Sequence, residues 1–390
     1  MTNNEEGPPG PAKPHRSYLD TASSTPLHPA AREVMTAALD QGYADPRRLH
    51  PPARTARLLL DNARQAVAET LGVRPDEVTF TATGTDAVHR GLLGLRRGRE
   101  RVGPVIVSSA VEHSAIAHAA AWVPGEHVEV GVDAWGRVDQ DAFVLAAGAP
   151  GVAVAALQSA NHEVGTVQPV EAVAAALWGP EAGGVPLFVD ARASMGRAPL
   201  PRGWDALAGS AHQWGGPAGV GVLLVRKGAR WRNPFPGDDR IDERTSGFEN
   251  VPAALAAAAA LQAVVAEQQE VAERQHALIA TIRAAVARIA DIDVVGDPVD
   301  RLPHLLTFSC LYADGEALVD GLARRGFDVA SGSACTASSL QPSRVLAAMG
   351  ALTHGNVRLS LGRESDTAEV DALLSVLPDV VASARAGAGG

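Results

Sequence analysis

The chain has little of several residue types that define major classes of protein. Its 390 residues include two cysteines and two lysines, and aromatic residues make up 4%. Two cysteines cannot form a disulfide framework, so the sequence predicts a reducing, cytoplasmic setting. No uninterrupted apolar run reaches the roughly 18 residues that a membrane span needs. The nearest candidate, the Ala-rich run 251–266, is interrupted by Pro252 and Gln262 and is expected to be a helix of a soluble protein.

The chain also has fewer basic than acidic residues. The chain has 34 Lys and Arg against 44 Asp and Glu, which gives a formal net charge of −10. Because nucleic-acid binding needs a basic face, we expect no nucleic-acid partner. The first 16 residues, MTNNEEGPPGPAKPHR, are polar and rich in Pro and Gly. They lack the apolar core of a signal peptide, and we interpret them as a disordered tail.

Short apolar runs alternate with helical patterns over most of the chain. Residues 54–72 place their apolar side chains on one helix face, while 105–108, 152–157 and 187–190 are short apolar runs typical of buried strands. This alternation predicts an α/β fold with a mostly parallel central sheet flanked by helices. After Asn250 the pattern changes to that of a smaller C-terminal α+β domain. We therefore predict a tail over 1–16, a large domain over 17–255 and a small domain over 256–390, with the N-terminal segment packed on the small domain.

Two polar motifs follow predicted strands of the large domain. In Phe80–Asp86, a strand, a small-residue turn and a helix start succeed one another, so the backbone N–H groups near Gly84 and Thr85 can form an anion site. The alternative is that Thr85 is an ordinary N-cap. Asp190 lies at the carboxyl end of a buried strand, where open α/β sheets bind ligands. Its alternative is a helix cap or a loop salt bridge.

Three further features suggest a site. Five of the seven residues 215–221 are Gly or Pro, which indicates an irregular loop after Ser210 and His212. Cys335 lies in a polar loop of small residues and is a candidate nucleophile, whereas Cys310, in an apolar strand pattern, is expected to be inert. Arg358, on a short strand between glycines, is suited to clamp a carboxylate, although a structural salt bridge is the alternative.

Together these segments resemble the cysteine desulfurases, in the class V aminotransferase group of fold-type I pyridoxal-phosphate (PLP) enzymes. The most specific part is Arg301-Leu302-Pro303-His304 followed by SGSACTASSLQPSRVLAAMG, residues 331–350, which is similar to the branch with a long Cys loop. The resemblance implies a fold-type I PLP-dependent transferase fold and sulfur mobilisation from L-cysteine. It also implies a homodimer, a sulfur-acceptor protein, PLP as cofactor and no metal.

The resemblance also implies the site residues. The cofactor-binding set is Gly84, Thr85, His113, Asn161, Asp190, Ser210 and His212. In the family, the residue matching His113 stacks on the pyridine ring and is catalytic, and the one matching Asp190 holds the pyridinium proton, which makes PLP an electron sink. Cys335 matches the thiol that takes the substrate sulfur as a persulfide. Arg358 and Asn161 match the substrate-binding residues.

The pattern departs from the family at its most important position. The residue after His212 is the Schiff-base lysine in the family, and here it is Gln213. Glutamine cannot form an imine, and it cannot take the Cα proton, a task worth about 10²–10⁴-fold in rate. The two lysines are Lys13, in the predicted tail, and Lys227, after the run 220–225.

Two smaller departures surround the same pocket. Ala193 stands where many desulfurases have Gln, and Phe248 stands where a Thr usually reaches the partner subunit's phosphate. Two hypotheses remain open. One is an enzyme that binds PLP non-covalently and uses His113 or His212 as base. The other is a catalytically inactive scaffold or persulfide relay without covalent PLP. The Cys loop disfavours a third, an unrelated PLP reaction.

Overall fold

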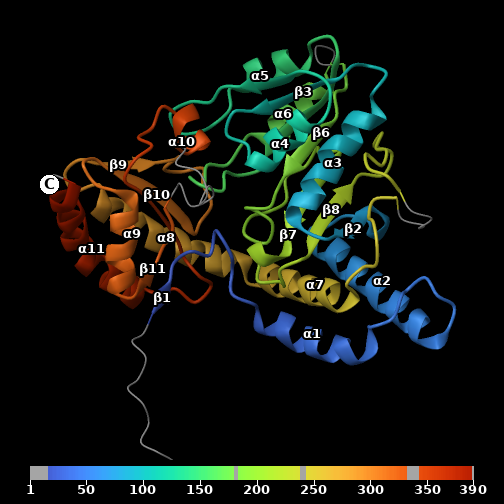
Figure 1. The fold of residues 1–390 in the computed structure, drawn as a ribbon, viewed down its shortest axis with the longest axis horizontal. Coiled ribbons are helices and arrows are strands. Elements are labelled where there is room, and N and C mark those ends of the chain that lie inside the picture. Colours follow the sequence, from blue (N-terminus) through green and yellow to red (C-terminus); the bar gives the residue numbers. More distant parts are fainter. Residues whose placement is uncertain (1–15, 180–182, 238–242, 332–341, 389–390) are drawn as a thin grey trace, which may run out of the picture.

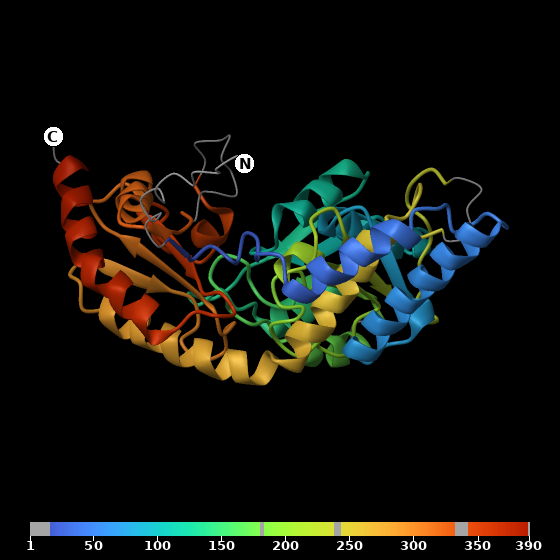
Figure 2. The ribbon, with the colours of Figure 1, turned by 90° about the horizontal axis from the view of Figure 1, so that it is seen from below.

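A computed structural model describes residues 16–179, 183–237, 243–331 and 342–388. Two lobes, joined by a long bent pair of helices, make up the molecule (Figures 1 and 2). The predicted tail, apart from Arg16, lies outside the described residues, as do Lys13 and Cys335. Arg16 forms an ion pair with Asp328.

The large domain is built on a seven-stranded sheet. In spatial order its strands are β2 (Val78–Thr81), β8 (Gly221–Val225), β7 (Ala206–Ser210), β6 (Leu187–Asp190), β5 (Val152–Gln158), β3 (Val105–Ser109) and β4 (His127–Val130). Strand β8 is antiparallel to both of its neighbours, and the other pairs are parallel. Strands β5 to β8 are buried along their whole length, because helices cover both faces of the sheet.

Helices form a layer on each face of this sheet (Figure 1). One face packs on α3 (Gly84–Gly98) and α4 (Ser114–Trp122). The residues of the other face share an apolar cluster with α2 (Pro51–Leu71), α5 (Gln140–Ala147), α6 (Val170–Leu177) and α7 (Val251–Ala266). Helix α1 (Pro29–Gln41) packs along α7, and the short helices η1 (Pro75–Glu77) and η2 (Ala211–Gln213) adjoin β2 and β7.

The small domain has its own antiparallel sheet and core. Its strands lie in the order β12 (Asn356–Ser360), β10 (Leu305–Cys310), β9 (Ile292–Val295). They pack with α8 (Gln268–Val286), α9 (Gly315–Arg324) and α11 (Thr367–Ala388), while α10 (Arg344–Ala348) faces the large domain. Leu19 lies in this core, next to the pair β1 (Ser17–Tyr18) and β11 (Phe327–Asp328). The predicted architecture, a mostly parallel sheet with a smaller α+β domain, is confirmed.

The bent pair α7–α8 connects the two cores. The helices meet at an angle of 66° beside Glu267. Helix α7 packs with the large-domain core and α8 with the small-domain core, so the packing changes beside Glu267 rather than at the predicted boundary of 255. Among the described helices, none is by itself long and apolar enough to span a membrane; the α7–α8 pair meets that criterion only when its two bent parts are combined.

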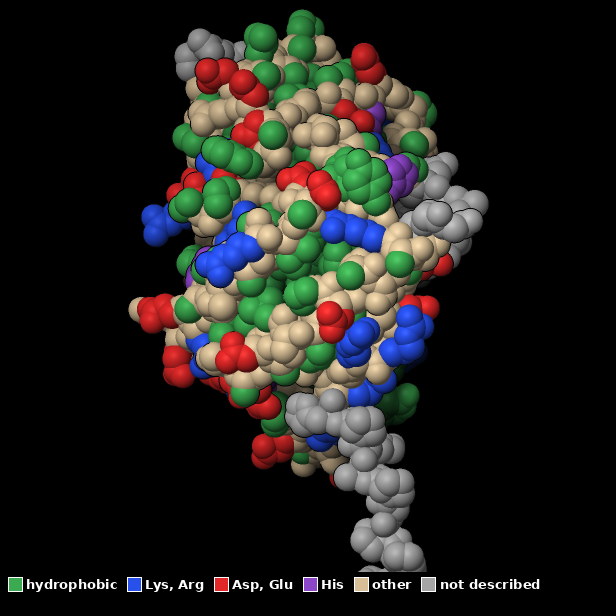
Figure 3. Space-filling view, turned by 90° about the vertical axis from the view of Figure 1, so that its left-hand side faces the viewer, with side chains coloured by type: hydrophobic (Ala, Val, Ile, Leu, Met, Phe, Trp, Pro, Cys, Tyr) green, Lys and Arg blue, Asp and Glu red, His purple; other side chains and the backbone are tan. Residues whose placement is uncertain are grey.

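The surface at the small-domain end of the molecule has mixed charge. Figure 3 views this end and shows basic and acidic side chains interspersed over it, around a hollow lined by apolar groups. On this face, therefore, the described arginines do not form one continuous basic area of the kind that a phosphate backbone needs.

Candidate active site

A cavity of about 590 Å³ lies where the carboxyl ends of the large-domain strands meet the N-terminal segment and β12. Strands β5, β6 and β7 end at this edge of the sheet, so their last residues face the same space. The cavity is lined by eight of the predicted site residues, namely Gly84, Thr85, His113, Asp190, Ser210, His212, Gln213 and Arg358. Sequence reasoning thus brought together residues from both domains.

The first turn of α3 forms one end of the cavity. Thr83 caps this helix, because its Oγ1 accepts a hydrogen bond of 3.0 Å from the backbone N–H of Asp86. The alternative that Thr85 is an ordinary N-cap is therefore wrong, and Thr85 lines the cavity. A Cβ on Gly84 would lie 2.5 Å from Cβ of Ser210, so only glycine lets the helix start approach β7 this closely. Backbone N–H groups at such a helix start attract anions.

Asp190 is held in an ion pair inside the cavity. Nε of Arg192 lies 2.9 Å from Oδ1 of Asp190, and Nη2 lies 2.6 Å from Oδ2. The side chain of Asp190 is 6% exposed and that of Arg192 is 13% exposed. Burial alone would raise the pKa of Asp190, but the guanidinium of Arg192 outweighs it and holds that pKa below its usual value. Asp190 is therefore a carboxylate whose two oxygens are already bound.

Burial lowers the pKa of each histidine that lines the cavity. Burial, aided by the charge of Arg192, lowers the pKa of His113 to about 4. Nδ1 of His113 also accepts a hydrogen bond from the backbone N–H of Ala115 at the start of α4. The His113 ring lies 4.9 Å from that of His162, and burial holds the pKa of His162 well below its usual value. Burial likewise lowers the pKa of His212, whose Nδ1 lies 3.1 Å from Oγ of Ser210.

Gln213 fixes the N-terminal segment to the cavity wall. Its Nε2 donates hydrogen bonds to the backbone carbonyls of Ala22 and Ser23, at 3.0 and 3.3 Å. The lysine in the described part of the chain, Lys227, is 66% exposed in its side chain and lies beside Asp76, outside the lining of this cavity. The amide at position 213 therefore has a structural role, and no described lysine can replace a lysine there.

Arg358 is buried and paired. Its side chain is 3% exposed, and Nη2 lies 3.0 Å from Oδ1 of Asp20 and also donates to Oγ of Ser23. Its Nη1 donates to the backbone carbonyl of His162. This matches the salt-bridge alternative, and a substrate carboxylate would have to compete with Asp20.

Among the described residues, one predicted site residue, Asn161, is not part of the cavity lining. Asn161 is buried, and its side chain binds the backbone of Val111, Glu163 and Val164. Cys335 belongs to the segment outside the described residues. Cys310 is 1% exposed, and burial raises the pKa of its thiol to about 11. Among the described residues, no three His, Cys, Asp or Glu side chains are grouped for a metal ion.

Sequence reasoning missed Arg192 and His162 as cavity residues. Arg192 follows Asp190 by two positions, in the turn just after β6, so it lies near the same edge of the sheet. That spacing was the available signal for Arg192. His162 follows the buried Asn161 in a turn, and the sequence contains no comparable signal for it.

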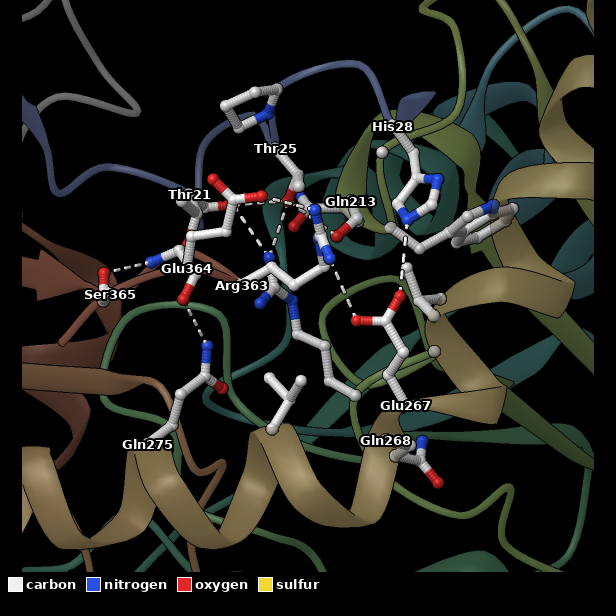
Figure 4. A pocket seen from close by; sticks show the side chains of 18 of the residues that line it. Thr21, Thr25, His28, Gln213, Glu267, Gln268, Gln275, Arg363, Glu364 and Ser365 are labelled. Carbon is white, nitrogen blue, oxygen red and sulfur yellow. Dashed lines mark hydrogen bonds and ion pairs between the residues drawn. The ribbon is translucent and has the colours of Figure 1, made fainter. Parts of the chain in front are cut away.

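A second cavity, also of about 590 Å³, lies on the other side of Gln213 (Figure 4). Glu267, at the α7–α8 bend, pairs there with His28 at 3.6 Å and with Arg363 at 3.1 Å. Its lining thus contains a network of opposite charges rather than a single uncompensated ion. Gln213 lines both cavities and forms part of the wall between them.

Comparisons with known proteins show the family to which the chain belongs. The family model of the class-V aminotransferases matches residues 17–373. An IscS-like cysteine desulfurase of Mycobacterium tuberculosis is 36% identical over 386 residues, which cover 95% of this chain and 97% of that protein. The chain belongs to the cysteine desulfurase family. A cysteine desulfurase of Cereibacter sphaeroides is 34% identical over 395 residues, covering 95% and 97%.

Solved structures of this family have the same fold. A NifS-like protein superposes with a TM-score of 0.86 at 27% identity, covering 94% of this chain and all of that one. The apo structure of a cysteine desulfurase from Thermococcus onnurineus superposes with a TM-score of 0.80, covering 94% and 95%. At 21% identity, this second likeness shows the fold alone.

Cysteine desulfurases depend on PLP, and the cavity fits only part of that cofactor. The start of α3, with Ser210 and His212, suits a phosphate group. The carboxylate of Asp190, however, is already bound by Arg192, and Gln213 cannot form the Schiff base. The described residues therefore do not fit a covalently held pyridinium, and we derive no catalytic step through PLP.

Proposed function

We propose that this chain takes part in sulfur mobilisation from L-cysteine as a persulfide relay. It carries sulfur on Cys335 and receives that sulfur from a donor persulfide, rather than cleaving cysteine in its own cavity. The observation that carries the proposal is the anchoring of Gln213 on the carbonyls of Ala22 and Ser23. The position of the family's lysine is thus held by the Gln213 amide, which has no basic nitrogen.

The transfer step needs no cofactor. The Cys335 thiolate attacks the outer sulfur of a donor persulfide, R–S–SH, and the donor S–S bond breaks. The donor leaves as its thiolate, and the new bond is the S–S bond of a Cys335 persulfide. No net oxidation takes place, because one sulfane sulfur moves between two thiols.

The ends of the Cys335 segment support this role. Ala330, just before the segment, pairs with Arg358 through backbone hydrogen bonds of 2.7 and 3.2 Å. Ser343, just after it, donates a hydrogen bond of 2.6 Å from Oγ to the carboxylate of Glu163. Arg358 donates to the backbone carbonyl of His162, and Nε2 of His162 lies 3.6 Å from the Glu163 carboxylate. His162 lines the cavity, so the residues that flank the segment are held beside it.

The cavity itself supports the relay over an enzyme that uses a substitute base. A general base works best when its pKa is near the working pH. The pKa of His113 is about 4 and its Nδ1 is engaged, while the pKa of His212 is also lowered. His113 is therefore poorly matched to removal of a Cα proton at neutral pH, and burial weakens His212 as a base in the same direction.

The test is to load the purified chain with sulfur. The full-length protein is incubated with a persulfide-loaded cysteine desulfurase or with cysteine persulfide, then alkylated and analysed by peptide mass spectrometry. We expect a persulfide on Cys335 that is absent from Cys335→Ser and retained in Cys310→Ser, the matched control. If neither donor leaves a persulfide on Cys335 in a folded sample, the proposal is wrong.

We further propose that the chain works as a homodimer in the cytoplasm. The α1–α2 hairpin carries exposed apolar side chains, with Tyr43 76% and Leu49 85% exposed in the single chain. A second copy of the chain would cover these large apolar side chains, which is what supports the dimer. Light scattering on the eluted protein should give twice the chain mass of 40.3 kDa, and a single-chain mass would refute the dimer.

A further inference from the structure

We propose that Arg192 fills the ring-binding part of the family's cofactor pocket and is the residue that excludes PLP from it. The inference concerns the cavity alone and does not depend on whether Cys335 receives sulfur. The cavity would then differ from the family's cofactor site in two ways: Gln213 stands at the lysine position, and Arg192 fills the space for the ring. Restoring the lysine by itself does not restore cofactor binding, because the space and the carboxylate are still occupied.

The path of the Arg192 side chain carries the proposal. At one end, its Cδ lies 2.9 Å from the point where a Cβ on Gly84 would sit, at the start of α3. At the other end, its guanidinium binds both oxygens of Asp190. These are the two places where the resemblance puts the phosphate and the pyridine nitrogen of one molecule. The Arg192 side chain thus runs through the interval that the ring would have to occupy.

The charge of Arg192 acts in the same direction as its bulk. A pyridinium reaching Asp190 would share one carboxylate with a guanidinium, and two like charges in a buried site repel each other. Arg192 also has a backbone N–H hydrogen bond of 3.1 Å to Oδ1 of Asp190, which fixes its position next to the carboxylate. Arg192 and Asp190 balance each other's charge. A ligand that took Asp190 would therefore leave the buried guanidinium of Arg192 without its partner.

The test measures covalent attachment of the cofactor, without any activity assay. Four full-length proteins are compared: the native chain, Gln213→Lys, Gln213→Lys with Arg192→Ala, and Gln213→Lys with Arg101→Ala. Arg101 is exposed, so its removal controls for the loss of one arginine. Each protein is incubated with PLP and reduced with borohydride. A lysine amine that has condensed with the aldehyde, releasing water, becomes a stable pyridoxyl amine. Peptide mass spectrometry then counts the groups at position 213.

We expect background labelling for the native chain, for Gln213→Lys and for the Arg101 control. We expect a rise to about one pyridoxyl group per chain when Arg192→Ala accompanies Gln213→Lys. Far-UV circular dichroism establishes that each protein is folded. If the alanine variant does not fold, Arg192→Ser in the same background is used, because serine also vacates the cavity and can donate to Asp190.

Two outcomes would overturn the inference. One is full labelling of Gln213→Lys alone, which would mean that Arg192 moves aside without cost. The other is background labelling of a folded protein that carries both changes, which would place the obstacle elsewhere in the cavity. None of these readouts involves Cys335. If this inference is overturned, the persulfide proposal still stands. If persulfide loading fails, this inference still stands.

Discussion

The guanidinium of Arg192 binds both carboxylate oxygens of Asp190, with Nη2 of Arg192 2.6 Å from Oδ2. In the family's cofactor site, the matching carboxylate is the group that holds the pyridinium proton. Here it is neutralised by a residue only two positions further along the chain, and both side chains are largely buried. The pair therefore occupies both oxygens of the carboxylate at the edge of the cavity.

Removing one partner of this ion pair should destabilise the protein. Arg192→Ala leaves a buried carboxylate without a partner, and we expect the free energy of unfolding to fall by about 3–5 kcal/mol. Adding Asp190→Asn removes the uncompensated charge and should recover part of that loss. Denaturant unfolding of the two variants measures the difference. Equal stability of the single and the double variant would argue against a buried ion pair.

The low pKa of His113 predicts a specific pH dependence of stability. Its pKa falls from 6.5 to about 4 in the folded protein, so between these values only the unfolded chain binds the proton. Stability is therefore lost as pH falls from 7 to 5, by about 2 kcal/mol from this residue. Asparagine at position 113 keeps an acceptor for Ala115 and should remove that part of the loss. A variant at an exposed histidine that does not act on His113, His354→Asn, should keep the native slope; an equal slope in all three proteins would refute the assignment.

The close contact between α3 and β7 predicts the effect of a single methyl group. A Cβ on Gly84 would lie 2.5 Å from Cβ and 2.6 Å from Oγ of Ser210. We expect Gly84→Ala to cost about 1–3 kcal/mol of stability by overpacking. The matched control is Gly131→Ala, because nothing lies within 4 Å of the new Cβ there. Thermal melting of both variants decides the point, and similar melting temperatures would contradict the packing described.

The two cysteines should differ sharply in reactivity. With a pKa of about 11, only about a thousandth of the Cys310 thiol is thiolate at pH 8, and its side chain is buried. We expect iodoacetamide at pH 8 to alkylate Cys335 first and to reach Cys310 only after unfolding. Peptide mass spectrometry over time gives both rates in one sample. Alkylation of both thiols at the same rate in the native protein would show that Cys310 is accessible.

The sequence was informative about the fold where apolar runs are short and bounded. Residues 152–157 and 187–190 read as buried strands because helices cover both faces of the sheet, which leaves no polar alternation. Their carboxyl ends located Asp190 correctly at a cavity. The antiparallel direction of β8 could not be predicted, since an apolar run such as 221–225 looks the same in either direction.

The site was less predictable because its chemistry depends on which side chains meet. Gln213 was identified from its place after His212, but its partners, Ala22 and Ser23, are almost two hundred residues away in sequence. Nothing in the sequence indicated that Asn161 would bind the backbone around it. The ion pair of Arg192 depends on a local turn after β6, which residue types alone do not specify.

Formation of alanine from L-cysteine distinguishes a relay from a desulfurase in a single assay. The purified full-length chain is incubated with L-cysteine, PLP and a thiol reductant, and alanine is measured against the concentration of protein. With Gln213 at the lysine position and Asp190 held by Arg192, we predict no alanine above a sample without protein. Release of several molecules of alanine per chain would contradict the relay and establish that the cavity cleaves cysteine itself.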